Sequence, residues 1–252
     1  MNLINVSIVS YLNSSPFLLG LQNSEIKNHI NLSSDIPSDC AKKLISGNAD
    51  IGLIPVAALL DLPNYELFSN YCIGANGAVN SVFIFSNTPI EQVKKIYLDF
   101  HSRTSNKLAE ILCEEFWKIK PEFIEHKNLE TNGLKIGEAF VQIGDRTFGK
   151  KNDFAFNYDL AFYWKELTGL PFVFAVWAST KKLDSLFIQL FNQALEYGLN
   201  KRPELISTLP KIKNFDADFY LNHNIQYDFS DSQKQALELF HSKIKLQLTN
   251  NF

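Results

Sequence analysis

Short apolar runs alternate with segments whose apolar residues recur every three or four positions along the first two thirds of the chain. The runs predict buried strands, and the periodic segments predict amphipathic helices. Strands are expected at 4–9, 31–33, 49–55, 71–77, 81–85, 96–98, 138–143 and 170–177. Helices are expected at 18–21, 37–46, 56–60, 106–113, 159–167, 183–199, 203–209, 216–221 and 230–248. Alternating strands and helices indicate an α/β protein, with a parallel sheet covered on both faces.

The pattern becomes almost entirely helical after residue 178. Helices with few strands cannot add another sheet layer, so we expect them to pack back on the first part of the chain. The prediction is therefore two lobes, 1–85 plus 178–252 and 86–177, joined by two crossovers through apolar strands. Open α/β sheets bind ligands beyond the carboxyl ends of their strands, which places a ligand cleft between the lobes.

One strand-to-helix turn carries a candidate anion site. Ser102, Arg103, Thr104 and Ser105 follow the strand at 96–98 and lead into a helix. Hydroxyl residues cap helix N-termini, where backbone N–H groups lack partners, and a guanidinium adds a fixed charge. The turn predicts a site for a carboxylate or phosphate. An ordinary capped helix with a surface arginine fits the same residues.

A second turn of this kind follows the first strand, where Tyr11 and Asn13 precede a helix. Ser81 and Asp145 also stand at strand ends that face the predicted cleft. A carboxylate at position 145 could act as a base, accept hydrogen bonds or hold an arginine. Each of these polar residues has an alternative interpretation as a turn residue whose hydrogen bonds are satisfied locally.

Composition narrows the function classes. The chain has 252 residues, 46% of them hydrophobic, which is enough for one large domain or two small ones. A formal net charge of -3 argues against a nucleic-acid partner. The five histidines lack ligand spacing and no glycine-rich phosphate loop is present, so we expect neither metal nor cofactor. The three separated cysteines are expected to be reduced core thiols.

The N-terminus has no basic segment before an apolar one, and no apolar run reaches the length of a membrane span. We therefore expect a cytoplasmic protein without a membrane partner. The pattern gives no indication of the oligomeric state.

Seven segments together resemble the chorismate dehydratases of the futalosine route to menaquinone. They are SYLN (10–13), PSDCA (37–41), ADIGLIPVAAL (49–59), IGA (73–75), SRTS (102–105), IGD (143–145) and TGLPFVFA (168–175). The resemblance implies a fold like the type II periplasmic binding proteins, used here by a cofactor-free cytoplasmic enzyme. A sister family, which makes dihydroxynaphthoate, has a different sequence in the turn that corresponds to residues 10–13 of this chain. One departure is Ala161-Phe162, where the family has a Gly-Glu pair.

The resemblance also implies a reaction and a site. Chorismate would lose water to give 3-[(1-carboxyvinyl)oxy]benzoate, with the proton leaving C3 and the hydroxyl leaving C4. Asn13 and Asp145 are the candidate catalytic residues, with the base either Asp145 or the enolpyruvyl carboxylate of chorismate, oriented by Asn13. The candidate substrate-binding residues are Ser10, Tyr11, Ser38, Ser81, Ser102, Arg103, Thr104, Ser105 and Gly144.

A non-catalytic cytoplasmic binding protein for a small aromatic or dicarboxylic acid would use the same cleft. A regulatory ligand-sensing module is a third possibility. It usually carries a basic DNA-binding segment, which the final helices lack.

Overall fold

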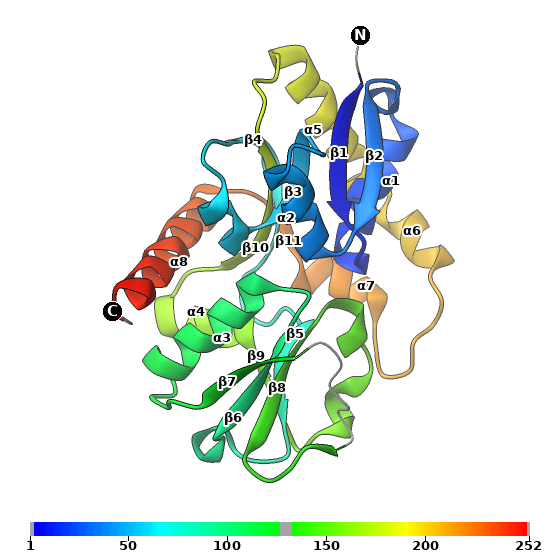
Figure 1. Ribbon diagram of the computed structural model, residues 1–252. Helices are drawn as coiled ribbons and strands as arrows, with labels where there is room; N and C mark the ends of the chain where they lie inside the picture. Colours follow the sequence, from blue (N-terminus) through cyan, green and yellow to red (C-terminus); the bar gives the residue numbers. More distant parts are fainter. Residues whose placement is uncertain (1–2, 127–132, 251–252) are drawn as a thin grey trace.

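Two β-sheets form the two lobes of the computed structural model, which describes residues 3–126 and 133–250 (Figure 1). The first sheet has the strand order β11-β4-β10-β3-β1-β2, and the second β7-β6-β8-β5-β9. The strands of the first sheet are β1 (Ile4–Val9), β2 (Ile30–Asp35), β3 (Ile51–Pro55), β4 (Glu66–Ala75), β10 (Phe172–Ser179) and β11 (Gln226–Asp228). Those of the second are β5 (Val82–Ser86), β6 (Lys95–Asp99), β7 (Glu122–His126), β8 (Glu138–Ile143) and β9 (Phe156–Asp159).

Helices cover both sheets. The α-helices are α1 (Ser15–Asn23), α2 (Pro37–Ile45), α3 (Arg103–Glu115), α4 (Leu160–Thr168), α5 (Ser185–Asn200), α6 (Arg202–Thr208), α7 (Ala217–Phe219) and α8 (Asp231–Asn250). Short 3-10 turns are η1 (Leu12–Ser14), η2 (Glu25–Asn28), η3 (Val56–Asp61), η4 (Ile90–Gln92), η6 (Gly144–Thr147) and η7 (Lys150–Asp153), and η8 (Tyr220–Asn224) is a π-helical turn. Within the described ranges, no helix is both long and apolar enough to cross a membrane.

The direction of the strands differs in part from the prediction of a parallel sheet. β1 is parallel to β2 and β3, whereas β10 is antiparallel to β3 and β4. The strands β7, β9 and β11 were not predicted. An apolar run indicates that a strand is buried, but the run carries no information about the direction of its partner.

The pairing also corrects the predicted lobe boundaries. β5 belongs to the second sheet although most of it was assigned to the first lobe, and β10 belongs to the first sheet although most of it was assigned to the second. The chain changes sheets between β4 and β5, through residues 76–81, and again through α4, between β9 and β10. A boundary placed on an apolar run cannot tell which sheet the run joins, because both interiors are equally apolar.

A single buried carboxylate, that of Asp159, ties the two crossovers together. It caps α4 by accepting from the N–H groups of Ala161 and Phe162, each at 3.1 Å. It also accepts from Val79 at 3.2 Å and from Asn80 at 2.7 Å in the other crossover. Burial raises the pKa of Asp159, while these backbone donors oppose that shift. Both connections between the lobes therefore meet at one side chain.

Helices α1 and α5 pack with their backbones almost in contact. A Cβ atom built on Gly20 would lie 1.9 Å from the carbonyl oxygen of Ala194, and one on Gly198 would lie 1.9 Å from that of Pro16. Only glycine leaves room for this approach. Because α1 begins directly after η1, its packing on α5 fixes the position of the Tyr11–Asn13 turn.

The C-terminal helix α8 packs on the first lobe, as expected, and it also contacts the second. It packs against β10 of the first sheet. Lys243 also pairs with Glu115 at the end of α3, and Gln247 donates to Glu114 at 3.0 Å. In Figure 1 this helix, drawn in red, runs along the side of the molecule.

Candidate active site between the lobes

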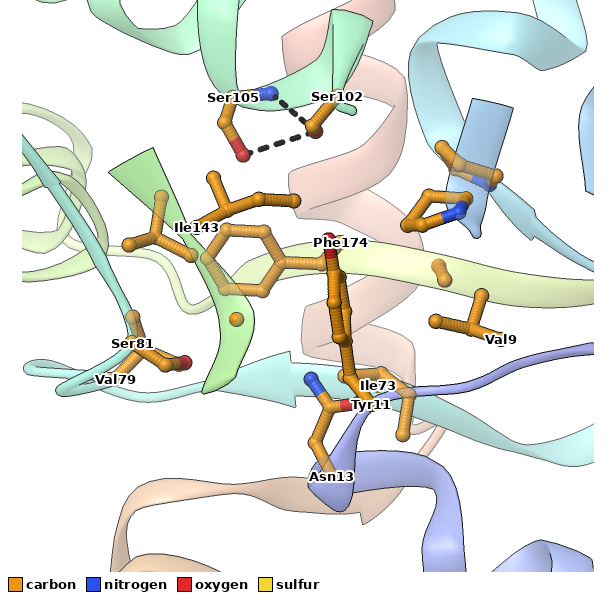
Figure 2. A pocket seen from close by; sticks show the side chains of 15 residues that line it. Val9, Tyr11, Asn13, Ile73, Val79, Ser81, Ser102, Ser105, Ile143 and Phe174 are labelled. Atoms are coloured by element: carbon orange, nitrogen blue, oxygen red, sulfur yellow. Dashed lines mark hydrogen bonds between the residues drawn. The ribbon is translucent and has the colours of Figure 1, made fainter. Parts of the chain in front are cut away.

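A cavity of about 50 Å³ lies where the lobes meet (Figure 2). It is lined by Val9, Tyr11, Asn13, Pro37, Pro55, Ile73, Val79, Ser81, Val82, Ser102, Ser105, Ile143, Gly144, Phe174 and Ala175. Figure 2 shows Asn13 on one side and Ser102 with Ser105 on the opposite side. This volume holds a few water molecules. A ligand with a six-membered ring therefore needs more room than the cavity has in this structure.

The start of α3 forms one polar wall. Ser102 is the N-cap and accepts from the N–H of Ser105 at 3.1 Å, and the two hydroxyl oxygens also lie 3.1 Å apart. The N–H groups of Arg103 and Thr104 in the first turn have no acceptor within the helix. Free N–H groups and the positive end of the helix dipole favour an anion at this wall.

Two predicted residues of this turn point elsewhere. Arg103 pairs with Asp61 of η3, and its side chain is 62% exposed. The buried hydroxyl of Thr104 accepts from the N–H of Ala57 at 3.1 Å. First-turn N–H groups point along the helix axis, whereas side chains leave it sideways, so the guanidinium does not reach the cavity. The predicted arginine clamp is therefore not formed here.

Tyr11 bridges the lobes at the edge of the cavity. Its hydroxyl shares a hydrogen bond of 3.0 Å with Nδ1 of His101. Burial raises the pKa of Tyr11 to about 12, against the opposing charge of Arg146. Burial and the same arginine lower the pKa of His101. At neutral pH the pair is therefore an uncharged phenol facing an uncharged imidazole.

Arg146 is held by the buried carboxylate of Asp99, at 2.5 Å, and not by Asp145. Asp99 stands at the end of β6 and also accepts from the N–H groups of Ile143 and His101, each at 3.0 Å. The sequence analysis did not select Arg146 as a binding residue. The sequence places Arg146 next to Asp145, and this adjacency does not indicate that Arg146 pairs with Asp99 instead.

Asp145 joins the lobes without lining the cavity. Both of its carboxylate oxygens accept from the N–H of Leu12, at 3.0 and 3.1 Å. Desolvation raises the pKa of Asp145, and the Leu12 N–H opposes the shift. The neighbouring Gly144 has a φ of 65°, and a Cβ there would lie 2.8 Å from the Tyr11 ring. The turn at 144–145 therefore shapes the contact with the first lobe.

Asn13 and Ser81 supply polar groups to the cavity from the first turn and from a crossover. The Asn13 Oδ1 atom is buried and has no partner among the described residues. Ser81 accepts a hydrogen bond from the buried hydroxyl of Tyr220 at 2.9 Å. A buried polar atom without a partner costs about 1–3 kcal/mol, so a bound ligand that donates to Asn13 would remove a penalty. Sequence reasoning missed Tyr220 because its helical segment showed no polar pattern pointing to the cleft.

The remaining candidates do not line the cavity. The Ser10 N–H donates to the Asp35 carbonyl at 2.8 Å, and Ser38 follows a cavity residue on α2 without lining the cavity itself. Ala161 is buried and Phe162 is 42% exposed, and neither lines the cavity. Within the described residues, no cluster of three or more His, Cys, Asp or Glu could hold a metal ion.

The cavity lining carries few side chains that can gain or lose a proton. Of the described residues that line it, Tyr11 alone has an ionisable side chain, and its raised pKa keeps it protonated. The other polar groups are hydroxyls, one amide and backbone N–H groups. Such a wall can bind and orient an anion, but it offers no side chain that takes up a proton near neutral pH.

A family model described as menaquinone biosynthesis matches residues 4–245. The chain belongs to this family. The match assigns it a role in menaquinone biosynthesis, as an enzyme. It agrees with the resemblance found in the sequence at the level of the pathway.

Solved structures similar to this menaquinone biosynthesis protein share its fold. A protein from Archaeoglobus fulgidus is 13% identical, with 97% of each chain covered and a TM-score of 0.74. An ABC transporter protein from Parabacteroides distasonis is 17% identical over 98% of this chain and 93% of its own, with a TM-score of 0.67. A Candida albicans protein described as having the generic periplasmic binding protein fold is 12% identical over 96% and 91%, with a TM-score of 0.64. The predicted two-lobed type II fold is confirmed.

Proposed function

We propose that this protein is a chorismate dehydratase, a hydro-lyase that converts chorismate to 3-[(1-carboxyvinyl)oxy]benzoate and water. The proton at C3 is acidified through the adjacent ring double bond by the ring carboxylate. Its removal and the departure of the C4 hydroxyl make the ring aromatic, which supplies a large driving force. The protein then has to bind two carboxylates, stabilise the charge that develops on one of them and orient the base.

The observation that carries the proposal is a mostly apolar cavity with a few polar groups and without a basic side chain in its described lining. Chorismate brings its own base, because its enolpyruvyl carboxylate lies close to C3. In this proposal the ring carboxylate binds at the free N–H groups of α3, between Ser102 and Ser105. Asn13 and Ser81 hold the enolpyruvyl carboxylate on the opposite side, and the released hydroxide takes up the proton to leave as water.

Two arginines give a matched test of how the dianion is held. Arg103→Ala removes an exposed ion pair worth at most about 1 kcal/mol, so KM for chorismate should stay within about twofold of the unmodified protein. Arg146 lies beside Tyr11 and His101 and pairs with the buried Asp99. Arg146→Ala leaves the charge of Asp99 uncompensated near the cavity, and this added negative charge should raise KM for the chorismate dianion about tenfold or more.

Initial-rate kinetics on both arginine variants measure this difference. Circular dichroism serves as the control, because Arg146→Ala also leaves the buried Asp99 without its cation. Equal KM values for the two variants would contradict a role for Arg146 in substrate affinity.

The direct test of the reaction is to incubate purified protein with chorismate in metal-free buffer and follow the products by chromatography and mass spectrometry. A product lighter by one water, with a benzoate spectrum, is expected. The similar solved structures include a transporter component, so the alternative is a binding protein without catalysis. Chorismate that binds and remains intact would favour that alternative.

A further inference from the structure

A buried tyrosine from the C-terminal segment reaches the wall of the cavity. Tyr220 begins the π-helical turn η8, far along the sequence from the other polar residues of the site. It is 1% exposed, and its hydroxyl donates to Oγ of Ser81 at 2.9 Å. Ser81 lines the cavity near Asn13, as Figure 2 shows. Tyr220 itself does not line it. Its hydroxyl also interacts with the side chain of Asn13, so an effect on a ligand can pass through Ser81 or through Asn13.

The backbone of Ser81 is fixed from both sides. Its carbonyl accepts from the N–H of Gly144 at 2.8 Å. The preceding residue, Asn80, donates its N–H to the buried carboxylate of Asp159 at 2.7 Å. What stays free at Ser81 is the rotation of its side chain and of its hydroxyl proton, since a serine hydroxyl turns to suit its partners.

We propose that Tyr220 is a positioning residue that directs the Ser81 hydroxyl at the bound substrate. The tyrosine donates to one lone pair of Ser81 Oγ and thereby fixes the side-chain rotamer. Ser81 then donates its own proton in another direction, toward the cavity and the enolpyruvyl carboxylate. This inference rests on the proposed function, because it assigns Ser81 a carboxylate as its acceptor.

A second buried tyrosine provides a matched control. Tyr227 in β11 is 5% exposed, and its hydroxyl has no hydrogen-bond partner among the described residues. Its ring packs on Phe17 at a centroid distance of 5.2 Å. Tyr227→Phe removes a hydroxyl from a similarly buried site, as Tyr220→Phe does. The Tyr227 hydroxyl, however, makes no hydrogen bond to a described residue that could hold a cavity side chain in place.

The ring of Tyr220 packs against Phe148 and Phe215, at centroid distances of 5.2 and 5.4 Å. Phenylalanine at position 220 keeps these contacts, and thermal unfolding of each variant checks that the fold persists. Any change in turnover can then be assigned to the lost hydroxyl.

The experiment is a double-mutant cycle of Tyr220→Phe and Ser81→Ala, with Tyr227→Phe alongside, measuring kcat and KM for chorismate. Losing one neutral hydrogen bond predicts a kcat about 3- to 10-fold lower for Tyr220→Phe. KM should change by less than about twofold, because orientation matters most in the transition state. Tyr227→Phe should stay within about twofold of the unmodified protein. In the Ser81→Ala background, the effect of Tyr220→Phe should shrink to about twofold or less, because the hydroxyl it positions is gone and only the contact with Asn13 remains.

Two results would overturn the inference alone. One is a Tyr220→Phe variant that behaves like Tyr227→Phe. The other is a Tyr220→Phe effect of the same size with and without the Ser81 hydroxyl, which would mean that the tyrosine does not act through Ser81. An unmodified protein that leaves chorismate unchanged would overturn the proposed function, and this inference with it.

Discussion

Replacing Asn13 by alanine is expected to lower kcat for chorismate about 100- to 1,000-fold, the loss that follows removal of one preorganised hydrogen-bonding group from an active site. The Asn13 side chain lines the cavity, and its amide N–H groups can donate to a carboxylate bound there. Without it, the enolpyruvyl carboxylate loses the group that aims it at C3. The fold should persist, because the side chain sits on a turn anchored by its backbone. Initial-rate kinetics with chorismate measure the effect.

Asp145→Ala is the comparison. Its carboxylate binds the Leu12 N–H and does not line the cavity, so its loss weakens the contact between the lobes without touching the base. We expect a loss of about tenfold in kcat/KM, near the lower end of what one charged hydrogen bond contributes, because the carboxylate does not touch the substrate. A larger loss of kcat for Asp145→Ala than for Asn13→Ala would reject the substrate's carboxylate as the base and point to Asp145.

Gly198→Ala should destabilise the protein strongly, although alanine is the better helix former. Helix propensity favours alanine by about 1 kcal/mol. The new Cβ, however, would lie 1.9 Å from the Pro16 carbonyl oxygen and 2.8 Å from the Gly20 nitrogen, and backbone atoms cannot give way as a side chain does. Overpacking that moves a helix costs about 1–3 kcal/mol or more. We expect a net loss of about 2 kcal/mol and a Tm lower by about 4–8 °C.

Gln193→Ala, on the exposed face of the same helix, is the control for this stability change. It should leave the free energy of unfolding within about 0.5 kcal/mol of the unmodified protein. Both variants are compared by thermal and urea unfolding. A Gly198→Ala protein with an unchanged or higher Tm would mean that α1 and α5 separate without cost. Because α1 continues directly from η1, a destabilised Gly198→Ala protein should also bind chorismate less well.

The local features of the site could be predicted from the sequence, whereas the directions in which its side chains point could not. The cap formed by Ser102 and the cavity position of Asn13 follow from residue types next to strand ends. The direction of Arg103 depends on Asp61, a residue distant in sequence, and the role of Tyr220 depends on how the C-terminal segment folds back. No pattern along the chain records such pairings.

The same limit applied to the sheets. Burial of β10 could be predicted from its apolar run, but its antiparallel pairing with β3 and β4 depends on where the chain re-enters the first lobe. The strands β7 and β9 carry mixed polar and apolar residues, so the pattern gave no strand there. Their pairing with β6 and β5 supplies the stability that their sequences do not show.

The shared anchor at Asp159 restricts how the lobes can separate. Two unconnected linkers would let one lobe twist, slide and swing against the other. Here both linkers are hydrogen-bonded to one carboxylate, so the two lobes share a pivot at that side chain and cannot slide past each other there. The helix α8 contacts both lobes, and its ion pair with α3 limits how far the swing can go. A shared pivot of this kind would bring the Ser102 wall back opposite Asn13 when the lobes close.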